Sequence, residues 1–346
     1  MALFLGLVIF SFIITAVAVV PFIDFLYRLR FIRQDESVAL DPGDSVAYKL
    51  IHKQHSHKIG TPIGGGVLII GVVAILFALV FPLMSRLGVY ISSSFSIKQE
   101  LNVIFFTFGS FGLLGLYDDI LKIFGFKKTG FFGLRVRHKL VIQLLIALAA
   151  AALLYFNLKI DIINIPFWGI LRLGWLYIPF AALVIVFFAN AFDFTDGLDG
   201  LSCGVLLICL LAFWALTLFS LDTPLSTFIA LWIGSLIAFL YFNVHPARLW
   251  LGNAGGLAFG ATLAIVGLLL GKIVALVVIG GIFVVELMSS FLQIVYFKST
   301  KGKRLFPIAP LHHWLQLLGW SESKIVMRAW LAAIMLALFG IWLAQL

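Results

Sequence analysis

Residues 190–201 of the chain read Asn190-Ala-Phe-Asp193-Phe-Thr195-Asp196-Gly197-Leu-Asp199-Gly200-Leu201. Three of the fifteen acidic residues of the chain fall within seven positions of this stretch, between two long apolar runs. A carboxylate at membrane depth is costly unless a polar group or a cation receives it. The Asp196-Gly-Leu-Asp199-Gly turn brings two carboxylates to one side of a short loop. The stretch therefore predicts a site for Mg2+ and phosphate groups where a helix leaves the bilayer.

The apolar runs on either side belong to a chain that is hydrophobic throughout. Of 346 residues, 63% are hydrophobic and only 11% are charged, whereas an ordinary soluble domain is about half apolar. The composition therefore excludes a soluble domain and predicts an all-α integral membrane protein. Runs long enough to span a bilayer, roughly 17 to 25 residues each, predict ten helices, at residues 2–27, 62–83, 101–117, 140–157, 176–192, 201–221, 226–243, 257–271, 273–297 and 325–345.

Two features of these runs need no special function. The first span has no basic segment before it and no small-residue cleavage site after it, so we expect a helix that is retained and not a cleaved signal. Cys203 and Cys209 lie inside one apolar run. They predict apolar packing and not a disulfide or a metal site.

The distribution of Lys and Arg predicts the orientation. If the N-terminus is outside, 19 of the 24 Lys and Arg residues fall on one side of the membrane, which is then the cytoplasmic side, and both termini are extracytoplasmic. The net charge of +9 serves this orientation, so no nucleic-acid partner is expected. We expect one polytopic domain, 1–346, whose polar clusters form cytoplasmic catalytic loops at 28–61, 118–139, 190–200, 243–256 and 298–324. The extracytoplasmic segment 161–175 contains only turn and interface residues.

Asp118 and Asp119 end the third predicted span, and Lys122 follows one helical turn later. Adjacent helical carboxylates face different directions, so one can bind a metal while the other acts as a base or hydrogen-bond acceptor. Lys122 is spaced to meet a phosphate or one of the two acids. The alternative is a solvated helix terminus with an ion pair.

The other polar clusters also have two interpretations each. The Gly-rich segment from Lys58 and Thr61 to Gly66 opens a span, which favours anion binding or close helix packing. Lys139 and Gln143 share a helix face that can reach a ligand. Trp250 predicts either an interfacial anchor or a stacking surface for a base.

Two clusters lie near the C-terminal end of the chain. Glu286 lies inside the ninth span with Ser289, Ser290 and Gln293 at helical spacing, which indicates either a functional acid or polar helix contacts. Further on, the basic residues Lys303 and Arg304 precede the adjacent histidines His312 and His313. This cluster predicts phosphate binding, with a basic surface loop as the alternative.

Taken together, these strings resemble the polyprenyl-phosphate N-acetylhexosamine-1-phosphate transferases, and within them the phospho-N-acetylmuramoyl-pentapeptide transferase family. The likeness covers residues 55–320 in the family's order. The matching strings are Gly60-Thr-Pro, Gly65-Gly66, Gly115 to Lys122, Lys139 to Gln143, Asn190 to Leu201, Asn243-Val-His-Pro-Ala247, and Phe297 to Arg304 followed by Pro310-Leu-His312-His313.

The resemblance implies a ten-helix, homodimeric enzyme of the bacterial inner membrane that requires Mg2+. Such enzymes transfer phospho-MurNAc-pentapeptide from UDP-MurNAc-pentapeptide to undecaprenyl phosphate, giving lipid I and UMP in peptidoglycan synthesis. The lipid phosphate attacks the sugar-linked phosphorus, either directly or after an aspartate has formed a covalent intermediate.

By motif position, the resemblance implies roles for individual residues. The catalytic positions are Asp118, Asp119, Asp196, His312 and His313. The substrate-binding positions are Lys58, Thr61, Lys122, Lys139, Asn190, Gly197, Leu198, Asp199, Asn243, Trp250, Lys303 and Arg304. The metal-binding positions are Asn253, Asp193 and Asp196.

The chain also departs from the family pattern. Asn253 stands at the family's metal-binding Asp and Gly256 at its Ser, while Trp314 replaces a third His and Gln316 the acid after it. The reverse replacement occurs at position 193, where this chain has Asp and the family has Asn. We hypothesise that Asp193 restores the carboxylate that Asn253 lacks, because Mg2+ sites usually keep one or two carboxylates.

Three alternatives remain at this point. A sibling transferase uses another UDP-N-acetylhexosamine. A catalytically impaired, scaffold-like relative is favoured by Asn253, Gly256 and Trp314. A transporter is the generic alternative for ten spans, but its ionisable residues line a path at the bilayer midplane, whereas those of this chain gather at one face.

Overall fold

The computed structural model describes residues 2–33, 50, 58–86, 88–125 and 133–346. In this part of the chain, ten helices are long and apolar enough to cross a membrane, as the hydropathy predicted. Their bounds are α1 (Ala2–Arg28), α3 (Gly65–Arg86), α4 (Ile97–Ile120), α6 (Val136–Ala152), α7 (Tyr177–Thr195), α8 (Leu201–Phe219), α9 (Thr223–Asn243), α10 (Gly252–Leu269), α12 (Gly281–Ser299) and α14 (Glu322–Ala344). α4 and α6 each continue for five residues as π-helical turns, Leu121–Gly125 and Leu153–Asn157.

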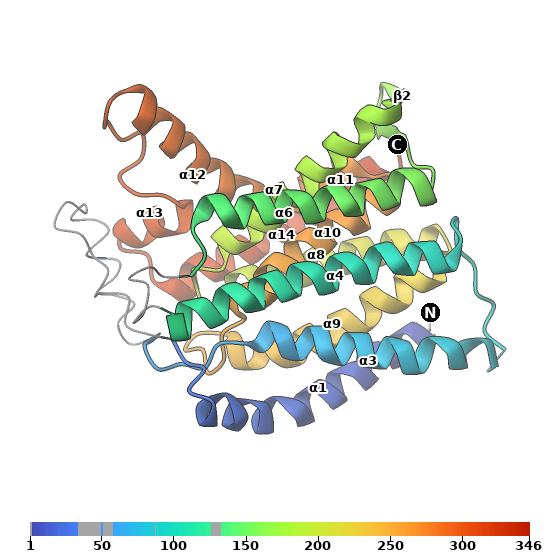
Figure 1. Ribbon diagram of the computed structural model, residues 1–346, viewed down its shortest axis with the longest axis horizontal. Helices are drawn as coiled ribbons and strands as arrows, with labels where there is room; N and C mark the ends of the chain where they lie inside the picture. Colours follow the sequence, from blue (N-terminus) through green and yellow to red (C-terminus); the bar gives the residue numbers. More distant parts are fainter. Residues whose placement is uncertain (1, 34–49, 51–57, 87, 126–132) are drawn as a thin grey trace.

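α9 and α10 are the most buried of the ten helices (their places are labelled in Figure 1). Within the most apolar 18 residues of each helix, 89% of the residues are buried in α10 and 83% in α9, but only 17% in α12. α10 packs on α4 and α7, and α9 packs on α1 and α3. Small residues permit this packing, because without side-chain bulk helix backbones approach closely.

Two glycines set how closely α10 approaches its neighbours. A Cβ added at Gly115 in α4 would overlap the backbone carbonyl of Asn253, and one added at Gly66 in α3 would overlap the backbone of Gly255. The C-terminal end of α4, which carries Asp118 and Asp119, therefore lies directly against the first turn of α10. Gly66 of the Gly-rich segment thus serves helix packing, one of the two interpretations of that sequence.

The ninth predicted span, 273–297, is not one continuous helix. It divides at Gly280 into the short α11 (Ile273–Ile279) and α12. A Cβ at Gly280 would lie 2.7 Å from the ring of Phe188, so the break occurs where α7 presses against the chain. Beyond the break, α12 diverges from the bundle (Figure 1).

Two elements are absent from the sequence prediction. The segment predicted as turns, 161–175, contains an antiparallel hairpin of β1 (Ile162–Ile165) and β2 (Gly169–Arg172), so the fold is mostly helical and not entirely so. The segment between α12 and α14 contains α13 (Leu311–Leu317), which carries both histidines. Neither element is long enough to give a membrane-span signal.

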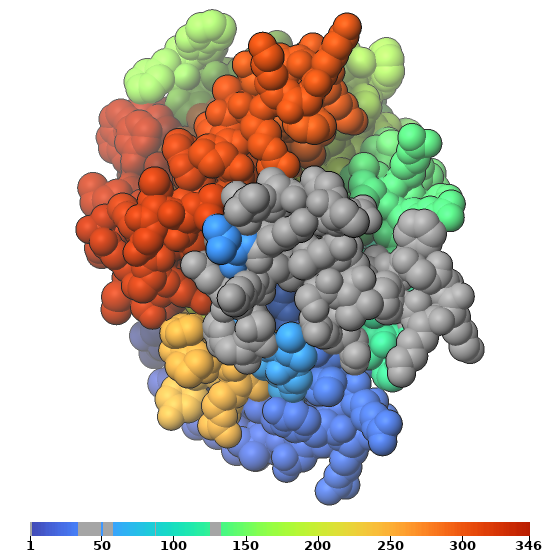
Figure 2. Space-filling model, turned by 90° about the vertical axis from the view of Figure 1, so that its left-hand side faces the viewer, coloured from blue at the N-terminus to red at the C-terminus, as the bar shows by residue number. Residues whose placement is uncertain are grey.

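The polar loops lie at one end of the bundle, and both termini lie at the other (Figure 1). Figure 2 views the loop end, where the C-terminal part of α1, the α9–α10 connection and the α12–α14 region all reach the surface. Parts of the predicted loops 28–61 and 118–139, namely 34–49, 51–57 and 126–132, lie outside the described residues. The remaining parts converge on the site described next.

Candidate active site

A pocket of 330 Å³ opens among the loops and is acidic at its centre. Three carboxylates and one side-chain amide contribute to its wall, together with two cationic side chains. The lining residues are Arg33, Ile63, Asp119, Lys122, Asp193, Phe194, Asp196, Trp250, Gly252 and Asn253. Residues from four of the five predicted catalytic loops thus meet in one cavity, which includes Asp193 and Asp196 of the opening stretch.

The adjacent aspartates at the end of α4 accept different N–H groups, although Asn253 donates to both. Both oxygens of Asp119 accept backbone N–H groups at the start of α10, Oδ1 from Asn253 and Oδ2 from Ala254, at 3.0 Å each. Asp118 accepts the N–H of Leu134 and the side-chain amide of Asn253. Both residues are buried, at 1% and 4% exposure. The alternative of a solvated helix terminus is therefore wrong.

Lys139 connects the two acidic helices. Its Nζ lies 2.8 Å from Oδ2 of Asp193 and 3.3 Å from Oδ2 of Asp118. Asp118 in turn accepts the amide of Asn253, so Asp193 and Asn253 belong to one polar network and line one pocket. Lys122, 40% exposed, lies 3.6 Å from Asp118 and adds positive charge at the rim.

Asp196 follows the last turn of α7 and accepts a hydrogen bond from the hydroxyl of Ser202. Burial, together with the neighbouring carboxylates Asp193, Asp199 and Asp119, raises the pKa of Asp196 to about 7, although the Ser202 hydrogen bond opposes the shift. A carboxyl group in such surroundings is stabilised as an anion by a bound cation.

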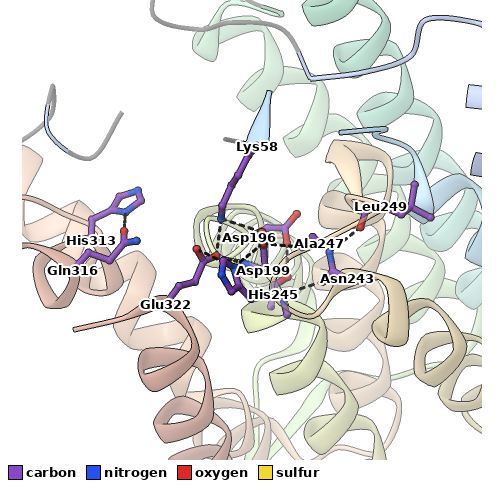
Figure 3. A network of polar contacts seen from close by, with 12 residues as sticks. Lys58, Asp196, Asp199, Asn243, His245, Ala247, Leu249, His313, Gln316 and Glu322 are labelled. Carbon is purple, nitrogen blue, oxygen red and sulfur yellow. Dashed lines mark hydrogen bonds and ion pairs between the residues drawn. The ribbon is translucent and has the colours of Figure 1, made fainter. Parts of the chain in front are cut away.

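Asp199 does not line the pocket but lies in a buried ion cluster (Figure 3). The two carboxylates of the turn therefore serve different sites, and not one shared site as predicted. The ammonium of Lys58 lies 2.9 Å from Oδ1 of Asp199 and 2.6 Å from Oε1 of Glu322. Nδ1 of His245 and the N–H of Ala247 both contact Oδ2 of Asp199, at 3.2 and 3.0 Å. Asp199, His245 and Glu322 are close enough together for a metal site, but Lys58 already supplies the positive charge between the two acids.

Two further predicted substrate-binding residues hold the scaffold together in this structure. Asn243 accepts the N–H of Gly200 and donates to the carbonyl of Leu249, which joins the α7–α8 turn to the α9–α10 loop (Figure 3). Asn190 donates to the side chain of Gln143 in α6 at 2.8 Å. Gln143 is fully buried, so its helix face binds α7. Their roles toward a substrate stay predictions.

One of the two histidines of α13, His312, packs against the acidic turn. A Cβ added at Gly197 would overlap Nε2 of His312, so only glycine permits this approach. His312 is 1% exposed, and its Nδ1 lies 3.0 Å from Oε2 of Glu286. Nδ1 of His313 lies 2.9 Å from the side-chain oxygen of Gln316, the residue at the family's acidic position.

Trp250 is 8% exposed and lies against two cations. The guanidinium of Arg33 and the ammonium of Lys58 lie 4.9 and 5.0 Å from its ring centroid. A ring enclosed in this way is not an interfacial anchor, and its place on the pocket wall agrees with the stacking alternative.

The remaining predicted residues do not line the pocket. Leu198 is buried, and the hydrogen bonds of Thr61 within the described part of the chain are backbone ones, to Lys58 and Arg33. Lys303 and Arg304 are exposed on the α12–α13 connection, where their positive charge faces solvent.

Sequence reasoning missed Glu322 and Arg33. Glu322 lies in the first turn of α14, where an acidic residue is common because it complements the helix dipole, so its position gave no functional signal. Arg33 was counted only among the orienting basic residues. Their positions follow only from the tertiary structure, which places Arg33 on the pocket wall and Glu322 next to Lys58.

Comparison with known proteins identifies the family of the chain. Residues 101–271 match the protein family Glycosyl transferase family 4. The chain is 34% identical to the phospho-N-acetylmuramoyl-pentapeptide-transferase of Caldicellulosiruptor bescii, over 98% of this chain and 97% of that protein. It is 34% identical to the enzyme of the same name from Bacillus pumilus, over 97% and 96%, and 35% identical to that of Listeria monocytogenes, over 92% and 91%. The chain therefore belongs to the phospho-N-acetylmuramoyl-pentapeptide transferase family.

Proposed function

We propose that the protein transfers phospho-MurNAc-pentapeptide from UDP-MurNAc-pentapeptide to undecaprenyl phosphate, giving lipid I and UMP. The observation that carries this proposal is the carboxylate-lined pocket with a cationic rim, which lies where the helices of a membrane bundle end. The relatives that match nearly the full length bear the name of this activity. The protein is thus a phosphoglycosyl transferase of peptidoglycan synthesis.

The proposal includes the placement of the enzyme in the cell. It is a multi-pass protein of the bacterial cytoplasmic membrane with both termini outside and the pocket on the cytoplasmic face. The excess of Lys and Arg on the side of the polar loops supports this orientation. A homodimer is also proposed, from the family resemblance, and sedimentation in detergent tests it.

The pocket suits Mg2+ by the chemistry of its donors. Asp193 and Asp196 offer carboxylate oxygens, and Asn253, whose amide N–H binds Asp118, keeps its carbonyl oxygen. Oxygen ligands with one or two carboxylates are what Mg2+ requires. When bound, the ion would neutralise the charge of the pyrophosphate.

Other side chains of the pocket would attract the diphosphate or act on the reacting groups. Lys122 and Arg33 place positive charge where a diphosphate would enter. Asp119, held by two N–H groups of α10, is rigidly oriented toward the same cavity. In the reaction a phosphate oxygen of the lipid forms a bond to the sugar-linked phosphorus, and the bond from that phosphorus to UMP breaks.

A UMP-release assay tests the proposal directly. The purified protein is supplied with undecaprenyl phosphate and either UDP-MurNAc-pentapeptide or UDP-GlcNAc, with Mg2+ or with EDTA. We expect Mg2+-dependent release from UDP-MurNAc-pentapeptide alone. Release only from UDP-GlcNAc would identify a sibling transferase, and no release from either donor would identify a scaffold-like relative.

The exchange of Asp and Asn at positions 193 and 253 makes a separate prediction. Asp193→Asn should raise the Mg2+ concentration for half-maximal activity about tenfold or more, because the site loses one of two carboxylates. The double variant Asp193→Asn/Asn253→Asp should restore it. Binding of Mn2+, measured by electron paramagnetic resonance, should weaken and recover in parallel. Unchanged metal binding in Asp193→Asn contradicts the exchange.

A further inference from the structure

A stripe of polar side chains runs along α12, the least buried of the ten helices. Glu286, Ser289 and Gln293 are spaced by three and four residues and so share one face. Polar groups in a lipid-exposed helix are costly unless they have partners. The proposed reaction assigns no role to these three residues.

Each member of the stripe accepts backbone N–H groups either from the segment that leads into α13 or from the first turn of α13. Gln293 accepts from Leu305 and Phe306 at 3.1 and 2.8 Å. Ser289 accepts the N–H of Leu311 at 3.1 Å. The stripe therefore fixes a segment that lacks regular secondary structure between residues 303 and 310.

Glu286 ends the stripe and contacts His312 twice. Its Oε2 lies 3.0 Å from Nδ1 and 3.4 Å from the backbone nitrogen of His312. Glu286 and His312 are 5% and 1% exposed. An ionised carboxylate only accepts hydrogen bonds, so with Glu286 ionised this contact places a proton on Nδ1 of His312.

The other ring nitrogen of His312 points at the catalytic turn. Nε2 lies against Gly197, next to Asp196. Among the residues that the structure describes, this buried Nε2 has no hydrogen-bond partner. A buried polar atom without a partner is uncommon in folded proteins and indicates a group reserved for a ligand or water.

We propose that Glu286 is a positioning residue. It holds His312 with the proton on Nδ1 and leaves the lone pair of Nε2 directed at the Asp196–Gly197 turn. Ser289 and Gln293 assist by fixing the segment that carries the histidine. A carboxylate that orients a histidine in this way determines which ring nitrogen is the acceptor.

The first test reads the tautomer and needs no turnover. Solid-state NMR of the 15N-histidine-labelled protein distinguishes protonated from bare ring nitrogens, and His312→Asn identifies the signal among the seven histidines. We expect a protonated Nδ1 and a bare Nε2, retained in Glu286→Gln, whose side-chain oxygen still accepts, and lost in Glu286→Leu. A bare Nδ1 or a doubly protonated ring in the wild type would overturn the proposal, even if Glu286→Leu does not fold.

The second test uses kinetics and rests on the proposed function. Glu286→Leu should lower kcat about ten- to a hundredfold, as loss of a histidine-orienting partner does at metal-bound histidines, with KM for the nucleotide sugar nearly unchanged. Glu286→Gln should recover most of the rate.

Glu100→Gln is the matched control, because Glu100 is fully buried in α4 and bonded to Ser93 at the opposite end of the bundle. It should retain the wild-type rate. Equal activity of Glu286→Leu and the wild type would overturn the proposal. If the wild type itself releases no UMP, the proposed function fails, while the NMR result still decides the role of Glu286.

Discussion

Asp119→Asn is expected to lower UMP release by about 10²- to 10⁴-fold, the range for loss of a positioned acid–base group. Asp119 lines the pocket, and its two oxygens accept the N–H groups of Asn253 and Ala254. An asparagine accepts only one of these and turns its own NH2 toward the other. The buried N–H left without an acceptor lowers the free energy of unfolding by about 1–3 kcal/mol. A protein with a stability of about 5–15 kcal/mol stays folded after such a loss, so unfolding does not explain the lower rate.

The control for this variant is Asp161→Asn. Asp161 pairs with the exposed Arg172 at 3.4 Å next to the β-hairpin, at the opposite end of the molecule. It should retain wild-type activity. Asp119→Asn activity within threefold of the wild type, in protein shown to be folded by gel filtration, would remove Asp119 from the reaction.

Lys58→Met is expected to lower the free energy of unfolding by about 3–5 kcal/mol, as removal of one partner from a buried ion pair does. Lys58, Asp199 and Glu322 have side-chain exposures of 2%, 2% and 8%. Without the ammonium, two carboxylates face each other in a site that water barely reaches. Unfolding in mixed micelles with increasing denaturing detergent measures the change.

Two further variants interpret that result. Lys98→Met removes an exposed lysine and should change stability by less than about 0.5 kcal/mol. Adding Glu322→Leu to Lys58→Met removes one of the opposed acids and should recover part of the loss, which a double-mutant cycle quantifies. A Lys58→Met protein as stable as Lys98→Met would mean that the cluster contributes little to folding.

The outline of the fold could be predicted because the bilayer acts on each helix separately. A helix that crosses about 30 Å of hydrocarbon must be apolar over its own length, so hydropathy located all ten spans. Basic residues must remain on one side, so their count also predicted that the polar loops share one end of the bundle, where the structure places them. Hydropathy did not predict the break at Gly280, where the ring of Phe188 in α7 packs against the chain.

The composition of the site could be predicted, but its hydrogen-bond partners could not. The sequence by itself determined that four carboxylates lie at a membrane boundary, where their desolvation is costly unless a cation or a polar group receives them. These are Asp118, Asp119, Asp193 and Asp196, and their clustering predicted one common site. Only the tertiary structure decided that Asp119 binds the start of α10, that Lys139 pairs with Asp193, and that Lys58 is enclosed by two acids, one of them 264 residues away in the chain. Hydropathy and charge are local properties, whereas a buried polar group is stabilised by whichever distant group the packing of the helices brings within about 3 Å.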